Sequence, residues 1–185
     1  MGARQTDTIL AANAILVNLQ YLMAYVLDGF ANAAESLTGR AIGARDSAGV
    51  GAIVHECLIW TLAAALAIAI IFAVAGPLAI RIVTSVPSVI ETAHRYLPWM
   101  VLSPLVCAWG FLYDGVFVGA QRAGAMFGVM LVAVVVVFLP VWWLTRGFGN
   151  HGLWFAFTLF NAARGLQQHL LFRDWLRHGS LLEVR

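Results

Sequence analysis

Long apolar stretches separated by short polar breaks dominate this sequence. Residues 57–80 and 123–145 contain no charged side chain, and a helix of about 20 predominantly apolar residues is long enough to cross a bilayer. Three further stretches have similar length but carry isolated polar groups. The pattern predicts an all-α, polytopic membrane protein with about five transmembrane helices, at residues 8–37, 51–74, 96–120, 124–144 and 152–172.

Glycine and proline set the expected ends of these helices. Gly76-Pro77 is expected to stop the second span, and segment 78–96 is then interpreted as a loop with a short interfacial helix. Between the fourth and fifth spans, the letters GFGNHG of residues 147–152 match the dinucleotide-binding pattern GxGxxG. That pattern needs a preceding strand within a βαβ unit, whereas this stretch lies between two membrane-length runs. We therefore expect a tight turn between helices.

The composition agrees with this class and excludes several others. Of the 185 residues, 62% are hydrophobic and 11% are charged, which leaves too little polar surface for a soluble fold. The net charge of +2 is small and dispersed, so no nucleic-acid partner is expected. Cys57 and Cys107 form no CxxC pair, and the histidines lack metal-ligand spacing. No nucleophile–base pair emerges, so we expect neither an enzyme nor a metal or cofactor.

The distribution of arginine predicts the orientation in the membrane. Five spans place the termini on opposite sides, and the side of the C-terminus carries more arginines: Arg40, Arg45, Arg122, Arg173, Arg177 and Arg185, against Arg4, Arg81, Arg95 and Arg146. By the positive-inside rule, this excess favours a cytoplasmic C-terminus with residues 173–185 as a tail. The predicted location is the cell inner (plasma) membrane, crossed several times.

Two acids lie inside the first span. A charged group at the bilayer centre costs at least about 2.5–3.5 kcal/mol, so such residues usually face a partner or a water-filled cavity. Asp28 and Glu35 are seven residues apart, which places them on one face of a helix. Tyr25 and Asn32 lie on or near the same stripe. We interpret the stripe as one wall of a wet or ligand-bearing cavity; the alternative places Glu35 among lipid headgroups, paired with Arg40.

The third span carries a second polar face, formed by Ser103, Cys107, Gly110, Asp114 and Gln121. A buried acid can take up a proton or a cation competitively, so Asp114 is a candidate cation-binding group. The alternative is an acid that only hydrogen-bonds a neighbouring helix. We assign the adjacent Tyr113 to the same cavity. Gly115-x-x-x-Gly119 predicts the close approach of another helix.

Arg164 is the only arginine well inside a span. Two interpretations are open for it. It is a candidate charge partner for one of the acids, or its long side chain reaches the membrane interface.

These residues resemble the multidrug and toxic compound extrusion (MATE) family, in its DNA-damage-inducible branch. The resemblance rests on the pattern DGFAxAAExLxGxAxGARD at residues 28–46 and on YDGxFxGAxR at residues 113–122. The order and spacing of the two patterns agree with the family, and the resemblance extends over the whole chain.

The resemblance implies a fold, an activity and a partner. Family members carry twelve helices in two six-helix lobes, and this chain resembles the second lobe without its first helix. The implied activity is export of organic, often cationic compounds, driven by inward flow of H⁺ or Na⁺. The matching carboxylate of sodium-driven members implies a role for Asp114 in cation coupling. In the DNA-damage-inducible branch, proton coupling is attributed largely to an aspartate of the first lobe, so the chain is expected to need that lobe.

The resulting hypothesis is the C-terminal part of a cation-coupled multidrug antiporter. Its partners are the lipid bilayer, small organic substrates and the N-terminal lobe, and its cavity is lined by Asp114, Asp28, Glu35, Asn32, Tyr25 and Tyr113. Two alternatives are open. One is a non-transporting membrane subunit or truncated remnant that packs against a partner. The other is a lipid-linked oligosaccharide flippase of the same superfamily, which would need several inward basic residues where only Arg164 is available.

Overall fold

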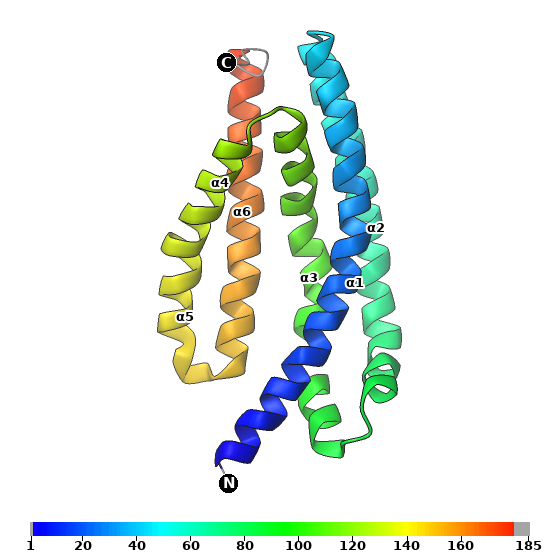
Figure 1. The fold of residues 1–185 in the computed structure, drawn as a ribbon, viewed down its shortest axis with the longest axis vertical. Coiled ribbons are helices and arrows are strands. Elements are labelled where there is room, and N and C mark those ends of the chain that lie inside the picture. Colours follow the sequence, from blue (N-terminus) through cyan, green and yellow to red (C-terminus); the bar gives the residue numbers. More distant parts are fainter. Residues whose placement is uncertain (1, 180–185) are drawn as a thin grey trace.

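The computed structural model describes residues 2–179, with side chains from residue 7 onward except at 47 and 48. This part of the chain is helical and contains no strand, which confirms the predicted fold class. Figure 1 shows the elements in chain order: α1 (Gly2–Gly43), α2 (Ser47–Val83), α3 (Pro87–Gly119), α4 (Ala123–Val132), a π-helical turn (Ala133–Phe138), α5 (Leu139–Thr145), a 3₁₀ turn (Arg146–Phe148) and α6 (Asn150–His178).

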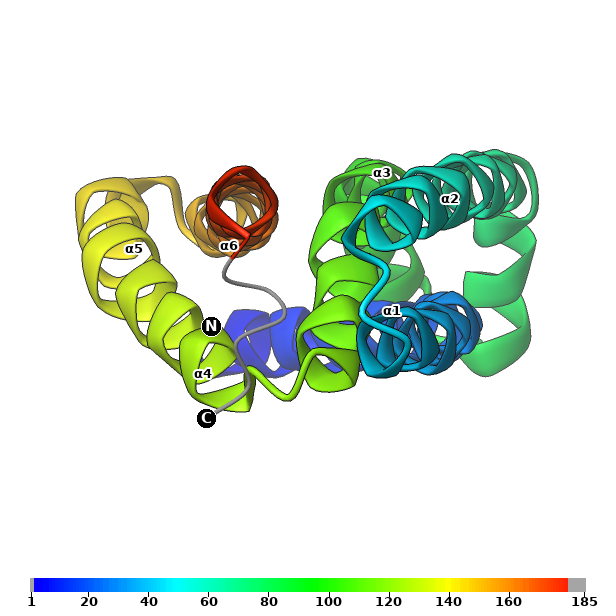
Figure 2. The ribbon, with the colours of Figure 1, turned by 90° about the horizontal axis from the view of Figure 1, so that it is seen from above.

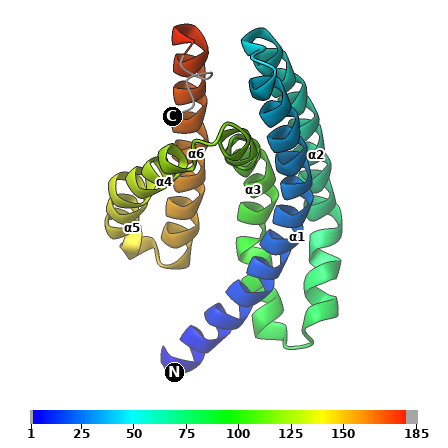
Figure 3. The same cartoon turned by 45° about the horizontal axis from the view of Figure 1, so that its top comes forward.

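The helices form two groups that meet where α3 faces α6 (Figures 2 and 3). One group contains α1, α2 and α3, and the other contains α4, α5 and α6. The first half of α1 slants across toward the start of α6. There Asn13 and Asn150 exchange two side-chain hydrogen bonds of 2.8 and 2.9 Å, which join the two groups at that end.

Four helical segments are long and apolar enough to cross a membrane by length and composition: Asp7–Gly43, Gly49–Val83, Pro87–Gly119 and Ala123–Phe148. The fifth predicted span corresponds to α6, which has 29 residues but a more polar composition. Its polar side chains Asn161, Arg164 and Gln168 are buried against the rest of the fold. Because lipid does not solvate polar groups, α6 needs this burial to lie at membrane depth.

The prediction that the second helix stops at Gly76-Pro77 is wrong, because α2 continues to Val83. Pro77 lacks an N–H group, so the helix gives up one internal hydrogen bond at this turn. Gly76 serves packing, since a Cβ atom on it would lie 2.9 Å from Leu97 Cδ1 of α3. Segment 78–96 is likewise helical except at residues 84–86. The expected tight turn in GFGNHG is present, with Gly149 at φ 59° before α6.

Glycines bring α3 into backbone contact with α1. A Cβ atom on Gly115 would overlap the carbonyl group of Ala31, and one on Gly119 would overlap that of Glu35. Gly39 of α1 approaches in return, with its Cβ position 3.4 Å from the Gly119 carbonyl oxygen. The close helix approach predicted from Gly115-x-x-x-Gly119 is therefore confirmed.

The C-terminal ends of α1 and α3 have the same backbone structure. Arg45 and Gln121 both adopt the left-handed conformation, with φ of 57° and 56°. In each case the next amide donates to a carbonyl five residues back, from Asp46 to Ala41 and from Arg122 to Phe117. This hydrogen bond is typical of the Schellman motif that ends helices. The sequences at the two ends are similar, Gly43-Ala44-Arg45-Asp46 in one and Gly119-Ala120-Gln121-Arg122 in the other.

We predict that Gly115→Ala lowers the free energy of unfolding of the protein in detergent micelles by roughly 1–3 kcal/mol, since the added methyl group forces α1 and α3 apart. The unfolding temperature of the variant should fall accordingly. Gly128→Ala in α4 is the matched control, because nothing lies within 4 Å of its Cβ position. Equal unfolding temperatures for the two variants would contradict the close α1–α3 contact.

Candidate cation-binding site

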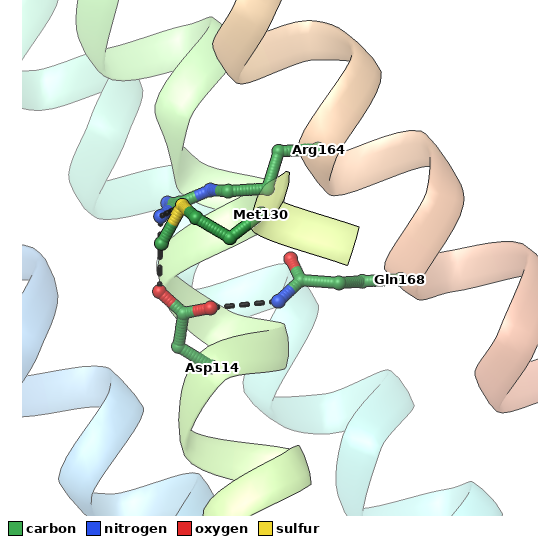
Figure 4. Close-up of polar contacts among 4 residues, drawn as sticks. All are labelled: Asp114, Met130, Arg164 and Gln168. Carbon is green, nitrogen blue, oxygen red and sulfur yellow. Dashed lines mark hydrogen bonds and ion pairs between the residues drawn. The ribbon is translucent and has the colours of Figure 1, made fainter. Parts of the chain in front are cut away.

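A charged network joins α3 to α6 at Asp114 (Figure 4). Arg164 Nη1 lies 3.3 Å from Asp114 Oδ2, and Gln168 Nε2 donates a hydrogen bond of 2.7 Å to Asp114 Oδ1. Arg164 and Gln168 are four residues apart on α6, so both side chains reach the same point of α3. Of the two positions expected for Arg164, the structure has the one that pairs with an acid.

The sequence around the guanidinium group makes room for it. A Cβ atom on Gly110 of α3 would lie 2.6 Å from Arg164 Nη2, and one on Gly165 of α6 would lie 3.1 Å from the Gly110 nitrogen. The guanidinium carbon lies 5.7 Å from the centre of the Phe111 ring, and Nη1 lies 3.9 Å from the sulfur of Met130. Larger residues at the two glycines would push α3 and α6 apart or displace the guanidinium group.

The network leaves two buried polar atoms without a hydrogen-bond partner among the described residues. These are Arg164 Nε, a donor, and Gln168 Oε1, an acceptor. Buried unpaired groups are rare in folded proteins and call for a specific explanation, such as a bound water or a ligand.

We define the acidic stripe of α1 by Tyr25, Asp28, Asn32 and Glu35. Most of these side chains are exposed. Asp28 and Asn32 are exposed, Glu35 is half-buried, and Tyr25 is 75% exposed. Asp28 lies three residues before Ala31, whose carbonyl group contacts α3 at Gly115, the residue after Asp114. Asp28 and Asp114 are therefore within about one helical turn of the same α1–α3 backbone contact, and the side chain of Asp114 is 29% exposed.

Tyr113 does not belong to this open face, which corrects its assignment to the cavity. Its side chain is 1% exposed, and its hydroxyl oxygen lies 2.7 Å from His169 Nδ1 of α6. The ring also packs against Phe172. Consecutive residues of a helix point about 100° apart, so Tyr113 and Asp114 have different surroundings.

Sequence reasoning did not identify Gln168 or Gln20 as site residues. Gln168 could have been found from its spacing of four residues after Arg164. Gln20 of α1 donates a 2.7 Å hydrogen bond to Ser103 Oγ of α3, and Ser103 Oγ lies 3.1 Å from Gln20 Oε1. Ser103, predicted on the polar face of the third span, thus binds α1, whereas Asp114 binds α6.

The described residues contain no group of three or more histidine, cysteine, aspartate or glutamate side chains that could hold a metal ion. The site consists instead of isolated carboxylates, amides and one guanidinium group between membrane-length helices. Such an arrangement can bind a cation electrostatically and can hold helices together. These features define a polytopic helical membrane protein with a charged network in a largely apolar core.

Comparison with known proteins places the chain in a family. The MatE family profile matches residues 2–144. The chain is 38% identical over 183 residues to DNA damage-inducible protein F of Escherichia coli (strain K12), covering 97% of this chain and 39% of that protein. It is 24% identical over 164 residues to Protein DETOXIFICATION 42 of Arabidopsis thaliana, covering 89% of this chain and 32% of that protein.

The fold agrees with these matches. The crystal structure of the eukaryotic MATE transporter AtDTX14 superposes with a TM-score of 0.82 at 18% identity, over 93% of this chain and 40% of that one. The chain belongs to the MatE family, as the sequence patterns predicted. It spans about two fifths of the length of the E. coli relative.

We predict that Asp114→Asn destabilises the protein, because it leaves the guanidinium group of Arg164 buried without its counter-charge. The expected loss is about 1–3 kcal/mol, below the usual range for a fully buried pair because the Asp114 side chain is partly exposed. Asp114→Asn/Arg164→Gln should regain part of this loss, since both charges are then absent. Thermal unfolding of Asp114→Asn, Arg164→Gln and the double variant measures the coupling free energy between the two residues. Strictly additive effects would show that the ion pair contributes nothing to stability.

Proposed function

We propose that the chain is the C-terminal part of a cation-coupled antiporter that exports small organic, often cationic compounds. The acidic stripe of α1 is the observation that carries this proposal. Asp28 and Asn32 are exposed although they lie within a membrane-length helix. Exposure of acids to lipid is costly, and an aqueous cavity removes that cost.

The cavity chemistry supports an organic cation as the exported compound. Asp28, Glu35 and Asp114 supply negative charge, while Tyr25 supplies an aromatic surface that attracts cations through its ring. The coupling ion is H⁺ or Na⁺, since either is attracted to a carboxylate in a site of low dielectric constant. Inward movement of that ion competes with the exported compound for the same acids.

The proposed partner is an N-terminal lobe that closes the cavity from the other side. The chain spans 39% of the E. coli relative, and a second lobe would account for part of the remainder. Alternating access in two-lobed transporters moves one half against the other around a shared site. We place this protein in the cell inner membrane with the C-terminus on the cytoplasmic side, where arginine is in excess.

We predict that this chain transports only when it is joined to an N-terminal lobe. The test protein, here called the joined transporter, is the E. coli relative with its matching C-terminal part replaced by this chain. In proteoliposomes it should export ethidium, a fluorescent organic cation, when an inward gradient of H⁺ or Na⁺ is imposed.

The isolated chain in matched proteoliposomes is the control and should show no gradient-driven export, because one lobe has nothing to move against. Export by the isolated chain would contradict the need for a second lobe. Ethidium movement by the joined transporter that is independent of both gradients would contradict ion coupling.

A further inference from the structure

The charges of Asp114, Arg164 and Asp28 are not equally compensated by opposite charges. Asp114 lies within ion-pair distance of Arg164 and also accepts a hydrogen bond from Gln168. Asp28 lies near the same α1–α3 backbone contact as Asp114, yet none of the ion pairs among the described residues includes it. Because Asp114 and Arg164 pair with each other, Asp28 keeps its negative charge without an ion-pair partner among the described residues.

We propose that Arg164 is an internal counter-ion that withdraws Asp114 from cation binding, and that Asp28 is the carboxylate of this lobe that takes up the coupling cation. The inference rests on the proposed function and assigns different roles to Asp28 and Asp114. Asp28 contacts the cation, whereas Arg164 and Asp114 are positioning residues that act through their charges.

The surroundings of Arg164 fit a permanent rather than a transient counter-ion. Its guanidinium group stays protonated in proteins, so it cannot leave the site by losing charge. The residue is 8% exposed and lies in the space provided by Gly110 and Gly165. Leaving Asp114 would bury the positive charge without a partner, which is costly in a medium of low dielectric constant.

The buried unpaired atoms support a ligand near this pair. Arg164 Nε offers a donor and Gln168 Oε1 offers an acceptor, and Gln168 is fully buried. A water molecule or a polar group of the exported compound that reaches both would complete the network. Arg164 and Asp114 then stay paired and help to orient the compound that binds beside them, while Asp28 binds and releases the coupling cation.

This arrangement gives Asp114→Asn an indirect effect. The substitution strands the positive charge of Arg164 near Asp28, and the guanidinium group then competes electrostatically with the coupling cation. Coupling is expected to weaken although Asp114 itself binds no cation. Removing the stranded charge as well, in Asp114→Asn/Arg164→Gln, should restore coupling. If Asp114 were instead the cation ligand, the double variant would remain defective.

The test measures ethidium export by the joined transporter as a function of the concentration of the coupling cation. Asp28→Asn and Asp114→Asn should each raise the half-saturating cation concentration by about tenfold or more. Asp114→Asn/Arg164→Gln should return it to within roughly threefold of the wild-type value. A merely structural role for Arg164 would change the maximal rate and the amount of folded protein, and would leave this concentration unaltered.

A second pair of variants covers the case in which Asp114→Asn fails to fold. Arg164→Gln in the Asp28→Asn background frees Asp114 to accept a cation, so it should lower the half-saturating cation concentration toward the wild-type value. Arg164→Lys in the same background keeps the positive charge and should leave that concentration raised. Wild-type coupling in Asp28→Asn, or equal behaviour of the Gln and Lys variants, would overturn the inference. Absence of gradient-driven export in the unmodified joined transporter would instead overturn the proposed function.

Discussion

Each charged group at membrane depth must be matched by an opposite charge or by water, because lipid provides neither. The ion pair between Asp114 and Arg164 meets this constraint at the seam between the two helix groups. It holds α6, the most polar of the long helices, against α3. Without the pair, the polar face of α6 would have to turn to lipid or to water. The position of α6 therefore depends on this contact.

The central helix α3 uses glycine on two different faces. Gly115 and Gly119 lie against the backbone of α1, while Gly110 lies beneath the guanidinium group of Arg164 from α6. Backbone contact on one face fixes the rotation of α3, and this rotation directs Asp114 toward α6. The same contact, between Ala31 and Gly115, brings the part of α1 that carries Asp28 next to the part of α3 that carries Asp114. Small residues thus determine where the charges meet.

Much of the fold follows from features that act within one helix. Apolar length predicted the helical membrane protein, and Gly115-x-x-x-Gly119 predicted a close helix contact. Contacts between helices that are distant in the sequence were harder to predict. Periodicity places Arg164 inside a span, but it does not say which acid lies opposite. The buried position of Tyr113 depends on His169 and was missed for the same reason.

The predicted effect of one glycine–proline pair on its helix was wrong. Gly76-Pro77 was expected to end a helix, whereas the packing of Gly76 against Leu97 favours continuation through the proline. The packing of α2 against α3 outweighs the tendency of Gly-Pro to end a helix. This is common in membrane helices, where neighbouring groups compensate for the missing hydrogen bond. The matching ends of α1 and α3 correspond to the similar sequences Gly43-Ala44-Arg45-Asp46 and Gly119-Ala120-Gln121-Arg122, and become evident when their backbones are compared.

The proposed function requires the acidic stripe of α1 to face water rather than lipid. The most direct measurement is labelling of Asn32→Cys in the joined transporter by a charged, membrane-impermeant thiol reagent, in a background without other cysteines. Ile71→Cys on α2 is the control, because Ile71 is 56% exposed in the chain and is expected to face lipid. The account predicts that Asn32→Cys reacts and Ile71→Cys does not. An Asn32→Cys variant as unreactive as the control would contradict it.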